Sequence, residues 1–161
     1  YTIDIGISAI TAASILSIVA GSSTAGRLAM GFISDKIGGR LVLSVCLVQV
    51  VLALVWLLFA SQVWMLYLFA VVFGLAFGGI ASLLPVVTTE LFGLKFLGSV
   101  FGAVLFFGTL GGALGAPMAG RIFDLTESYH IAFIINVVVG TLAIFLSLIL
   151  LRYKKQGSSP E

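Results

Sequence analysis

The residues that could do chemistry gather in one stretch, "GRLAMGFISDKIGGR", at positions 26–40. Arg27, Asp35, Lys36 and Arg40 all fall here, although only 9% of the 161-residue chain is charged. A guanidinium binds a carboxylate through two parallel hydrogen bonds, whereas an ammonium acts as a point charge. An aspartate at a helix end can accept hydrogen bonds from N–H groups at the positive end of a partner helix. Their role therefore depends on the elements that hold them.

Enzymatic chemistry finds little support in the other polar residues. The chain has one histidine, His130, and one cysteine, Cys46, so no metal-ligand cluster of usual spacing exists. No phosphate-binding G-x-x-x-x-G-K-[ST] motif occurs, and no serine has an evident histidine partner. The net charge is only +2, without a basic stripe for nucleic acid. We expect no enzymatic activity, metal, cofactor or nucleic-acid partner.

The elements around these residues are apolar, since 61% of the chain is hydrophobic. Charged and turn residues separate five apolar runs, at about 5–33, 41–60, 64–89, 96–120 and 131–151. Each run is long enough to cross a hydrocarbon core of about 30 Å as a helix. Barrel strands need only about 10 residues and alternate in polarity, which these runs do not. The sequence predicts an all-α membrane protein with a five-helix bundle over residues 1–151 and a basic tail at 152–161.

The basic residues predict the orientation of this bundle. Short connections make neighbouring helices antiparallel, so alternate connections lie on the same side of the membrane. One side holds Lys36, Arg40, Lys95, Arg152, Lys154 and Lys155. The other side holds only Arg121. The positive-inside rule therefore predicts a cytoplasmic C-terminus and an external Tyr1. Five spans with an external start suggest a fragment whose N-terminal part is missing.

Glycines at a spacing of four predict close helix packing. Gly74 pairs with Gly78, and Gly108 pairs with Gly112, so each pair lies on one helix face. The small residues of the stretch "AGSSTAG" predict similar close packing in the first span. The glycine-rich first, third and fourth spans predict an inner layer, and the glycine-poor second and fifth spans a lipid-facing layer. Static packing is the simpler role of each pair, and sliding of inner helices is the alternative.

The segment "GFISDKIGGR" at 31–40 resembles the signature loop of the major facilitator superfamily, roughly G-x-L-A-D-[RK]-x-G-R-[RK]. The matching positions are Gly31, Asp35, Lys36, Gly38 and Arg40. Gly39 departs from the pattern, since a basic residue is usual there. "FGLAFGG", "LLPVVTTELFG" and "GALGAPMAGRIFDLTESY" look like helices ten and eleven of the monocarboxylate and oxalate–formate porter branch. The resemblance covers nearly the whole chain and implies a partial major-facilitator bundle, helices eight to twelve.

The resemblance implies a secondary active transporter that moves a small solute by alternating access, in a plasma or inner membrane. A monocarboxylate is the first candidate, with a coupled proton or an exchanged anion, and the missing N-terminal half would be a partner. The resemblance places Arg27 at the carboxylate-binding centre; the alternative is an arginine snorkelling to headgroups. Ser23 stands where some monocarboxylate porters carry an aspartate. The fourth span lacks the lysine of oxalate-type antiporters, so the substrate stays open.

The resemblance also implies that the signature loop latches the two halves of a transporter in one state. Gly38 and Gly39 permit a tight turn, and Glu90 ends the third span on the same side. Glu90 could therefore pair with Arg40 or Lys36. The plainer interpretation is a polar loop that only sets the topology. For the whole chain, the alternative function is a non-transporting membrane subunit or scaffold that packs through its glycine faces.

Overall fold

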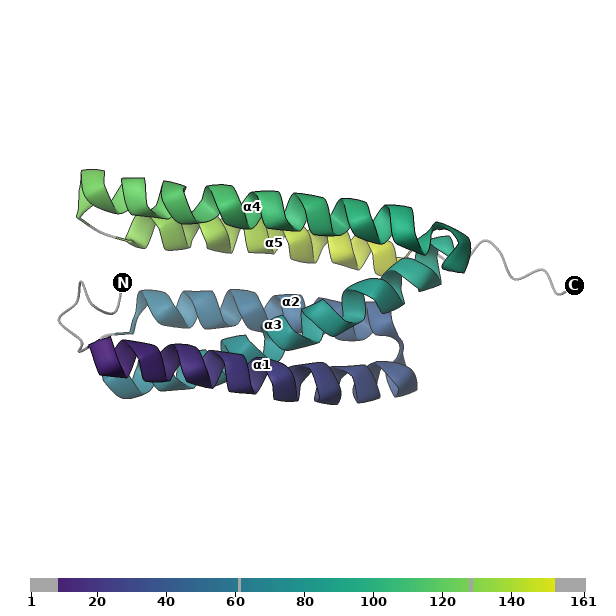
Figure 1. Cartoon of the computed structure of the whole chain (residues 1–161), viewed down its shortest axis with the longest axis horizontal. Coiled ribbons are helices and arrows are strands. Elements are labelled where there is room, and N and C mark those ends of the chain that lie inside the picture. The colour runs from purple at the N-terminus through teal and green to yellow at the C-terminus, as the bar shows by residue number, and fades with distance from the viewer. Residues whose placement is uncertain (1–8, 61, 128, 153–161) are drawn as a thin grey trace, which may run out of the picture.

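A computed structural model describes residues 9–60, 62–127 and 129–152, which form five long helices (Figure 1). The helices are α1 (Ala9–Ile37), α2 (Gly39–Leu58), α3 (Val63–Phe92), α4 (Leu97–Thr126) and α5 (His130–Arg152), with a 3₁₀ turn η1 at Leu94–Phe96. All five are long and apolar enough to cross a membrane. The described residues contain no strand. The predicted all-α fold with five membrane spans is confirmed.

The charged connections are shorter than the sequence suggested. Asp35 and Lys36 still belong to α1, and α2 begins at Gly39, so only Gly38 separates the two helices. Its φ of 94° is one that glycine adopts without strain. Arg121 likewise lies inside α4. A helix of about 30 residues is roughly 45 Å long, as thick as a bilayer with its headgroups. The helix ends can therefore reach water without a loop.

The helices alternate in direction, so the described connections lie at the two ends of the bundle (Figure 1). The α1–α2 and α3–α4 junctions share one end with the C-terminal end of α5, and the α2–α3 and α4–α5 junctions share the other. This arrangement agrees with the predicted antiparallel order. The beginning of the first predicted span, at 5–8, and the basic tail at 153–161 lie outside the described residues.

The core lies among α1, α2 and α3. One buried cluster joins Ile15, Leu57, Leu66 and Ala70 from these three helices. A second cluster, Val42, Cys46 and Leu83, fills the α2–α3 contact. α3 runs obliquely in Figure 1 and packs against both α1 and α2, while α2 also packs against α5. The signature stretch is thus held by the best-packed part of the chain.

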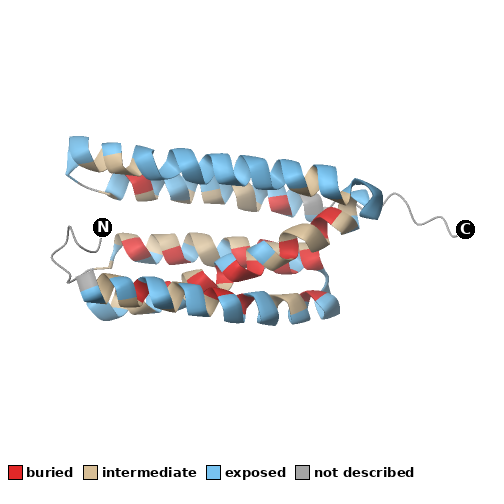
Figure 2. Cartoon of the chain, in the orientation of Figure 1, coloured by how far each residue is buried: buried red, intermediate tan, exposed pale blue. Residues whose placement is uncertain are grey.

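The predicted inner and outer layers do not match this packing. α2, expected to face lipid, is covered on two sides, because Cys46 packs against Leu83 of α3 and Ser44 meets Ser147 of α5. Between these two sides it exposes Val45 and Leu52. α4, expected in the inner layer, has no buried residue among those described (Figure 2). Within this chain, glycine content therefore does not decide which helix is covered.

The contact between α1 and α3 brings backbone against backbone. A Cβ atom added to Gly74 would lie 2.7 Å from the carbonyl oxygen of Val19, and one added to Gly78 would overlap the backbone of Ser23. From the other side, Gly26 lies against the backbone of Leu75. These glycines therefore allow an approach that no larger residue permits.

The second predicted glycine pair has a different environment. Gly108 and Gly112 lie on α4 with nothing within 4 Å of an added Cβ atom. Their predicted packing role would therefore need a surface that the described residues do not supply. That role stays a prediction.

Candidate substrate-binding and gating sites

Arg27 lies on a face of α1 that no other described helix covers. Residues at helical spacings of three and four form this face, and all are exposed except the half-buried Gly31: Ala13, Ser17, Ala20, Thr24, Arg27, Gly31 and Asp35. We call them the open stripe of α1. Its side chains are small or polar, whereas most of the rest of the helix is apolar. Such a face suits a polar cavity better than lipid.

The position of Arg27 along α1 places it inside the apolar span. It stands ten residues before the last residue of the helix, Ile37, which is roughly 15 Å along the axis. Within the described part of the chain it makes no hydrogen bond or ion pair. Two hydroxyl groups share its stripe, and each donates to a carbonyl one turn back: Ser17 to Ala13 at 3.0 Å and Thr24 to Ala20 at 3.2 Å. Arg27 is thus the group on the stripe whose donors are free for a ligand.

Ser23, the other predicted substrate residue, lies one helical turn before Arg27, at the edge where the open stripe meets the α1–α3 contact. It is only 7% exposed, and its backbone touches Gly78 of α3. The α1–α3 contact therefore covers most of Ser23, whereas Arg27 beside it is exposed. Its role in binding stays a prediction.

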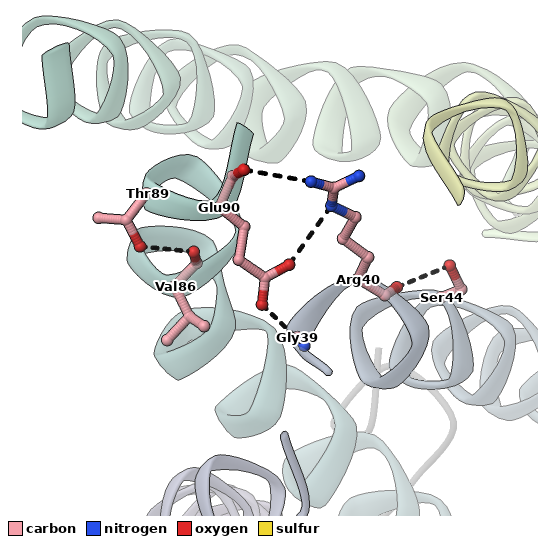
Figure 3. Close-up of polar contacts among 6 residues, drawn as sticks. All are labelled: Gly39, Arg40, Ser44, Val86, Thr89 and Glu90. Carbon is pink, nitrogen blue, oxygen red and sulfur yellow. Dashed lines mark hydrogen bonds and ion pairs between the residues drawn. The ribbon is translucent and has the colours of Figure 1, made fainter. Parts of the chain in front are cut away.

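Arg40 and Glu90 form an ion pair that fastens the start of α2 to the end of α3 (Figure 3). The Nε atom of Arg40 lies 3.3 Å from Oε2 of Glu90, and the two side chains are 18% and 34% exposed. The Nη2 group of Arg40 also donates to the backbone carbonyl of Glu90 at 3.1 Å. Of the two pairings that the sequence allowed for Glu90, the structure has the one with Arg40.

Gly39 completes this network from the backbone. Its N–H group donates to Oε1 of Glu90 at 3.1 Å, so the carboxylate holds both a side chain and the first N–H of α2 (Figure 3). Space is tight here, because a Cβ atom on Gly39 would lie 3.0 Å from Oε1 of Glu90. The glycine that departs from the family pattern therefore has a local role as a close-approach donor. Sequence comparison with the signature loop could not show this.

The remaining signature residues have other surroundings. Asp35 and Lys36 are exposed at the end of α1. The ammonium of Lys36 lies 4.4 Å from the centroid of the Phe32 ring, a cation–π distance. Gly31 has open space around it, and Gly38 forms the break between α1 and α2. The loop thus divides into an exposed half and a half that is joined to α3.

Two polar contacts that the sequence did not single out also tie α2 to its neighbours. The hydroxyls of Ser44 and Ser147 lie 2.7 Å apart in the buried α2–α5 contact. Ser44 donates to the carbonyl of Arg40 at 3.0 Å, so Ser147 is the donor between the two serines. Gln49 donates to the carbonyl of Val72 on α3 at 3.1 Å. The only sequence signal for these contacts was a polar residue within an otherwise apolar span.

The described residues contain no group of three or more His, Cys, Asp or Glu side chains that could hold a metal ion. The candidate sites are thus an unpaired arginine and a charged helix junction, an arrangement suited to solute recognition and conformational control. The sequence model of the Major Facilitator Superfamily matches residues 1–161. The chain belongs to this superfamily. Together with five apolar helices, this makes it part of an integral, multi-pass membrane protein.

Individual relatives point to one branch of the superfamily. The chain is 35% identical over 121 residues to "Monocarboxylate transporter 9" of Pongo abelii, covering 74% of this chain and 24% of the relative. It is 31% identical over 139 residues to "Monocarboxylate transporter 12" of Homo sapiens, covering 84% and 27%. It is also 33% identical over 120 residues to "MFS transporter asaE" of Aspergillus flavus, covering 74% and 27%. The monocarboxylate-type resemblance seen in the sequence is therefore confirmed.

The chain spans about a quarter of the length of these curated relatives. No solved structure matches it. The comparisons therefore give the family and the branch, and the roles of individual residues must be argued from the geometry above.

Proposed function

We propose that this chain is the C-terminal part of a secondary transporter that moves a small monocarboxylate by alternating access. The observation that carries the proposal is Arg27, an unpaired guanidinium on the open stripe of an apolar helix. Two relatives are named monocarboxylate transporters, which supports the same substrate class. A coupled proton or an exchanged anion would accompany the solute. The scaffold alternative gains no support from relatives with these names.

The energetics of Arg27 favour a ligand. Placing an arginine at the centre of a membrane helix costs about 2.5–3.5 kcal/mol on insertion scales. A carboxylate that accepts from two N–H groups of the guanidinium forms two charge-assisted hydrogen bonds, each worth about 1.5–3 kcal/mol. Ligand binding could therefore offset the whole cost of burying the charge. Around it, Ala20 and Gly31 leave room for a small organic anion.

We propose that the network of Gly39, Arg40 and Glu90 acts as the gate. It joins α2 to α3 one residue after Gly38, the break that separates α1 from α2. Movement of α1 against α3 would therefore strain the contacts that Gly39 and Arg40 make with Glu90. The basic residues at this end favour a cytoplasmic orientation, which also places the C-terminus inside. The gate would then open and close the cytoplasmic side in alternating access.

Replacing Arg27 tests the binding site. Arg27→Lys keeps the charge but loses the bidentate fork, so we expect monocarboxylate uptake by the full-length protein to fall about tenfold, the effect of losing one charge-assisted hydrogen bond. The measurement is initial uptake of labelled lactate or pyruvate at matched membrane expression. Arg121→Lys, an exposed arginine on α4, is the control and should leave uptake unchanged.

The snorkelling alternative makes the opposite prediction. A lysine snorkels as well as an arginine, so unaltered uptake by the Arg27→Lys protein would remove Arg27 from the binding site. If the unmodified full-length protein took up no monocarboxylate under either a proton gradient or anion exchange, the proposed substrate class would be wrong.

A further inference from the structure

The turn between α3 and α4 exposes large apolar side chains at the end of the bundle. Phe92 is 54% exposed, Leu94 81% and Phe96 53%. Lys95, in the middle of η1, is also exposed, and its ammonium lies 5.7 Å from the centroid of the Phe96 ring. Connections on the aqueous side are usually polar. The apolar side chains in this turn therefore need a physical account.

Two polar groups beside this turn already have partners within the chain. The N–H group of Gly93 donates to the carbonyl of Thr89 at 2.9 Å, and the carboxylate of Glu90 is held by Gly39 and Arg40. Of the charged side chains in the stretch 90–97, this leaves Lys95 facing outward. The turn thus presents three apolar groups and one cation.

The length of the flanking helices gives the depth of this turn. α3 and α4 each have 30 residues, which is roughly 45 Å along the axis. A bilayer with both headgroup regions is about 40–45 Å thick. The end of α3 and the start of α4 therefore lie at the level of the headgroups, where an apolar side chain can reach the acyl chains while a lysine reaches the phosphates.

We infer that the turn formed by Phe92, Leu94, Lys95 and Phe96 is an interfacial anchor that binds anionic phospholipid in the leaflet at this end. Phe92, Leu94 and Phe96 enter the boundary between headgroups and acyl chains, and Lys95 binds the lipid phosphate. Charge complementarity selects an anionic lipid, because Lys95 is an exposed cation while Glu90 is held by Arg40 and Gly39. In the neighbouring α1–α2 junction, the exposed charges of Asp35 and Lys36 balance each other. The inference requires only membrane insertion and does not depend on the proposed solute.

Site-specific photo-crosslinking in bilayers tests this anchor. Position 94 of the full-length protein receives p-benzoylphenylalanine in place of leucine, and the protein is reconstituted in equimolar phosphatidylcholine and phosphatidylglycerol. After irradiation, mass spectrometry identifies the adducts. We expect lipid adducts, enriched up to about fivefold in phosphatidylglycerol. Lys95→Gln should remove the enrichment but keep the adducts, and Lys95→Arg should keep both.

Leu125 provides a matched control at the opposite end of α4. It is 79% exposed, close to the 81% of Leu94, but its neighbours Asp124 and Glu127 are acidic. The same probe at position 125 should show no preference for phosphatidylglycerol. Adducts from position 94 to peptide instead of lipid would overturn the inference, because the turn would then be covered by protein. Lipid adducts with no anionic preference, or a preference that survives Lys95→Gln, would overturn the assignment of Lys95.

Discussion

Arg27 and Arg40 stand 13 positions apart in the chain, yet their surroundings are opposite. Arg40 is 18% exposed, and its guanidinium binds both the carboxylate and the backbone carbonyl of Glu90. Arg27 is exposed and makes no such contact within the described residues. A paired guanidinium at a helix junction holds structure together, whereas an unpaired one inside a membrane span is available for a ligand. The two residues should therefore respond differently to mutation.

A double-mutant cycle on Arg40 and Glu90 measures the strength of the ion pair in the proposed gate. Glu90→Gln removes the charge but keeps the backbone carbonyl that accepts from Arg40 and leaves an amide oxygen for Gly39. We expect a coupling energy of about 1 kcal/mol between Glu90→Gln and Arg40→Gln, the range for a partly exposed pair at a contact. The free energy of unfolding of the purified protein in mixed micelles provides the readout.

Lys36→Gln is the control for this cycle. Lys36 has the same charge and lies in the same loop, but its described contact is the Phe32 ring. It should therefore show no coupling with Glu90→Gln. Zero coupling for Arg40, or equal coupling for both residues, would mean that the ion pair adds nothing beyond general charge.

For single residues, the sequence predicted which side chains carry charge at this junction but not which of them pair. It offered Glu90 as a partner for Arg40 or Lys36, because all three are charged and lie on one side of the membrane. It could not choose between them, since that choice depends on which face of α3 meets α2. It also could not show that Gly39 would donate its N–H group to Glu90, because a backbone donor has no signature in residue type.

At the scale of elements, the α1–α3 contact is the one most sensitive to side-chain size. Gly74, Gly78 and Gly26 lie where an added Cβ atom would meet backbone atoms of the facing helix. A backbone cannot move aside as a flexible side chain can. The helices would have to separate, which would also disturb the buried cluster around Ile15 and Ala70.

The stabilities of the Gly78→Ala and Gly108→Ala variants should distinguish a glycine in a helix contact from a glycine on an uncovered face. Gly78→Ala forces a methyl group into the backbone of Ser23, so we expect a loss of about 2 kcal/mol or more in the free energy of unfolding. Gly108→Ala meets open space and should change stability by less than about 1 kcal/mol, in the stabilising direction. Both variants are measured as the isolated 161-residue chain in micelles. Equal losses would contradict the observed α1–α3 contact.

The same spacing of glycines thus predicted two helix faces, and only one of them is covered in this chain. Periodicity shows that residues share a face, but it does not show which neighbour meets that face. Helix ends were also predicted too early, because charged residues were expected to end a span, and α1 continues through Asp35 and Lys36 to Ile37. The type of each element was predictable from apolar length alone, whereas its limits and its partners depend on packing.

At the scale of the whole molecule, the chain divides into a packed part and an uncovered part. α1, α2 and α3 share the two core clusters, while α4 buries nothing among the described residues and makes few contacts with α3 and α5. The open stripe of α1 is uncovered as well. In the proposed transporter, the open stripe would face the solute path and α4 would face the other half of the molecule. Relatives about three times as long as this chain have the residues to supply that half.

This division predicts that the 161-residue chain alone inserts into membranes but does not transport. Its five apolar helices should insert, because each is long enough to span the bilayer. Alternating access requires two halves that rock around a midplane site, and Arg27 makes no hydrogen bond or ion pair within the described residues. Liposomes containing the chain should therefore show circular dichroism of a helical protein but no lactate uptake above protein-free liposomes, under either a proton gradient or preloaded anion. Liposomes with the full-length protein are the positive control. Uptake by the chain alone would show that a complete solute path is built from these five helices, and the proposed need for a second half would be wrong.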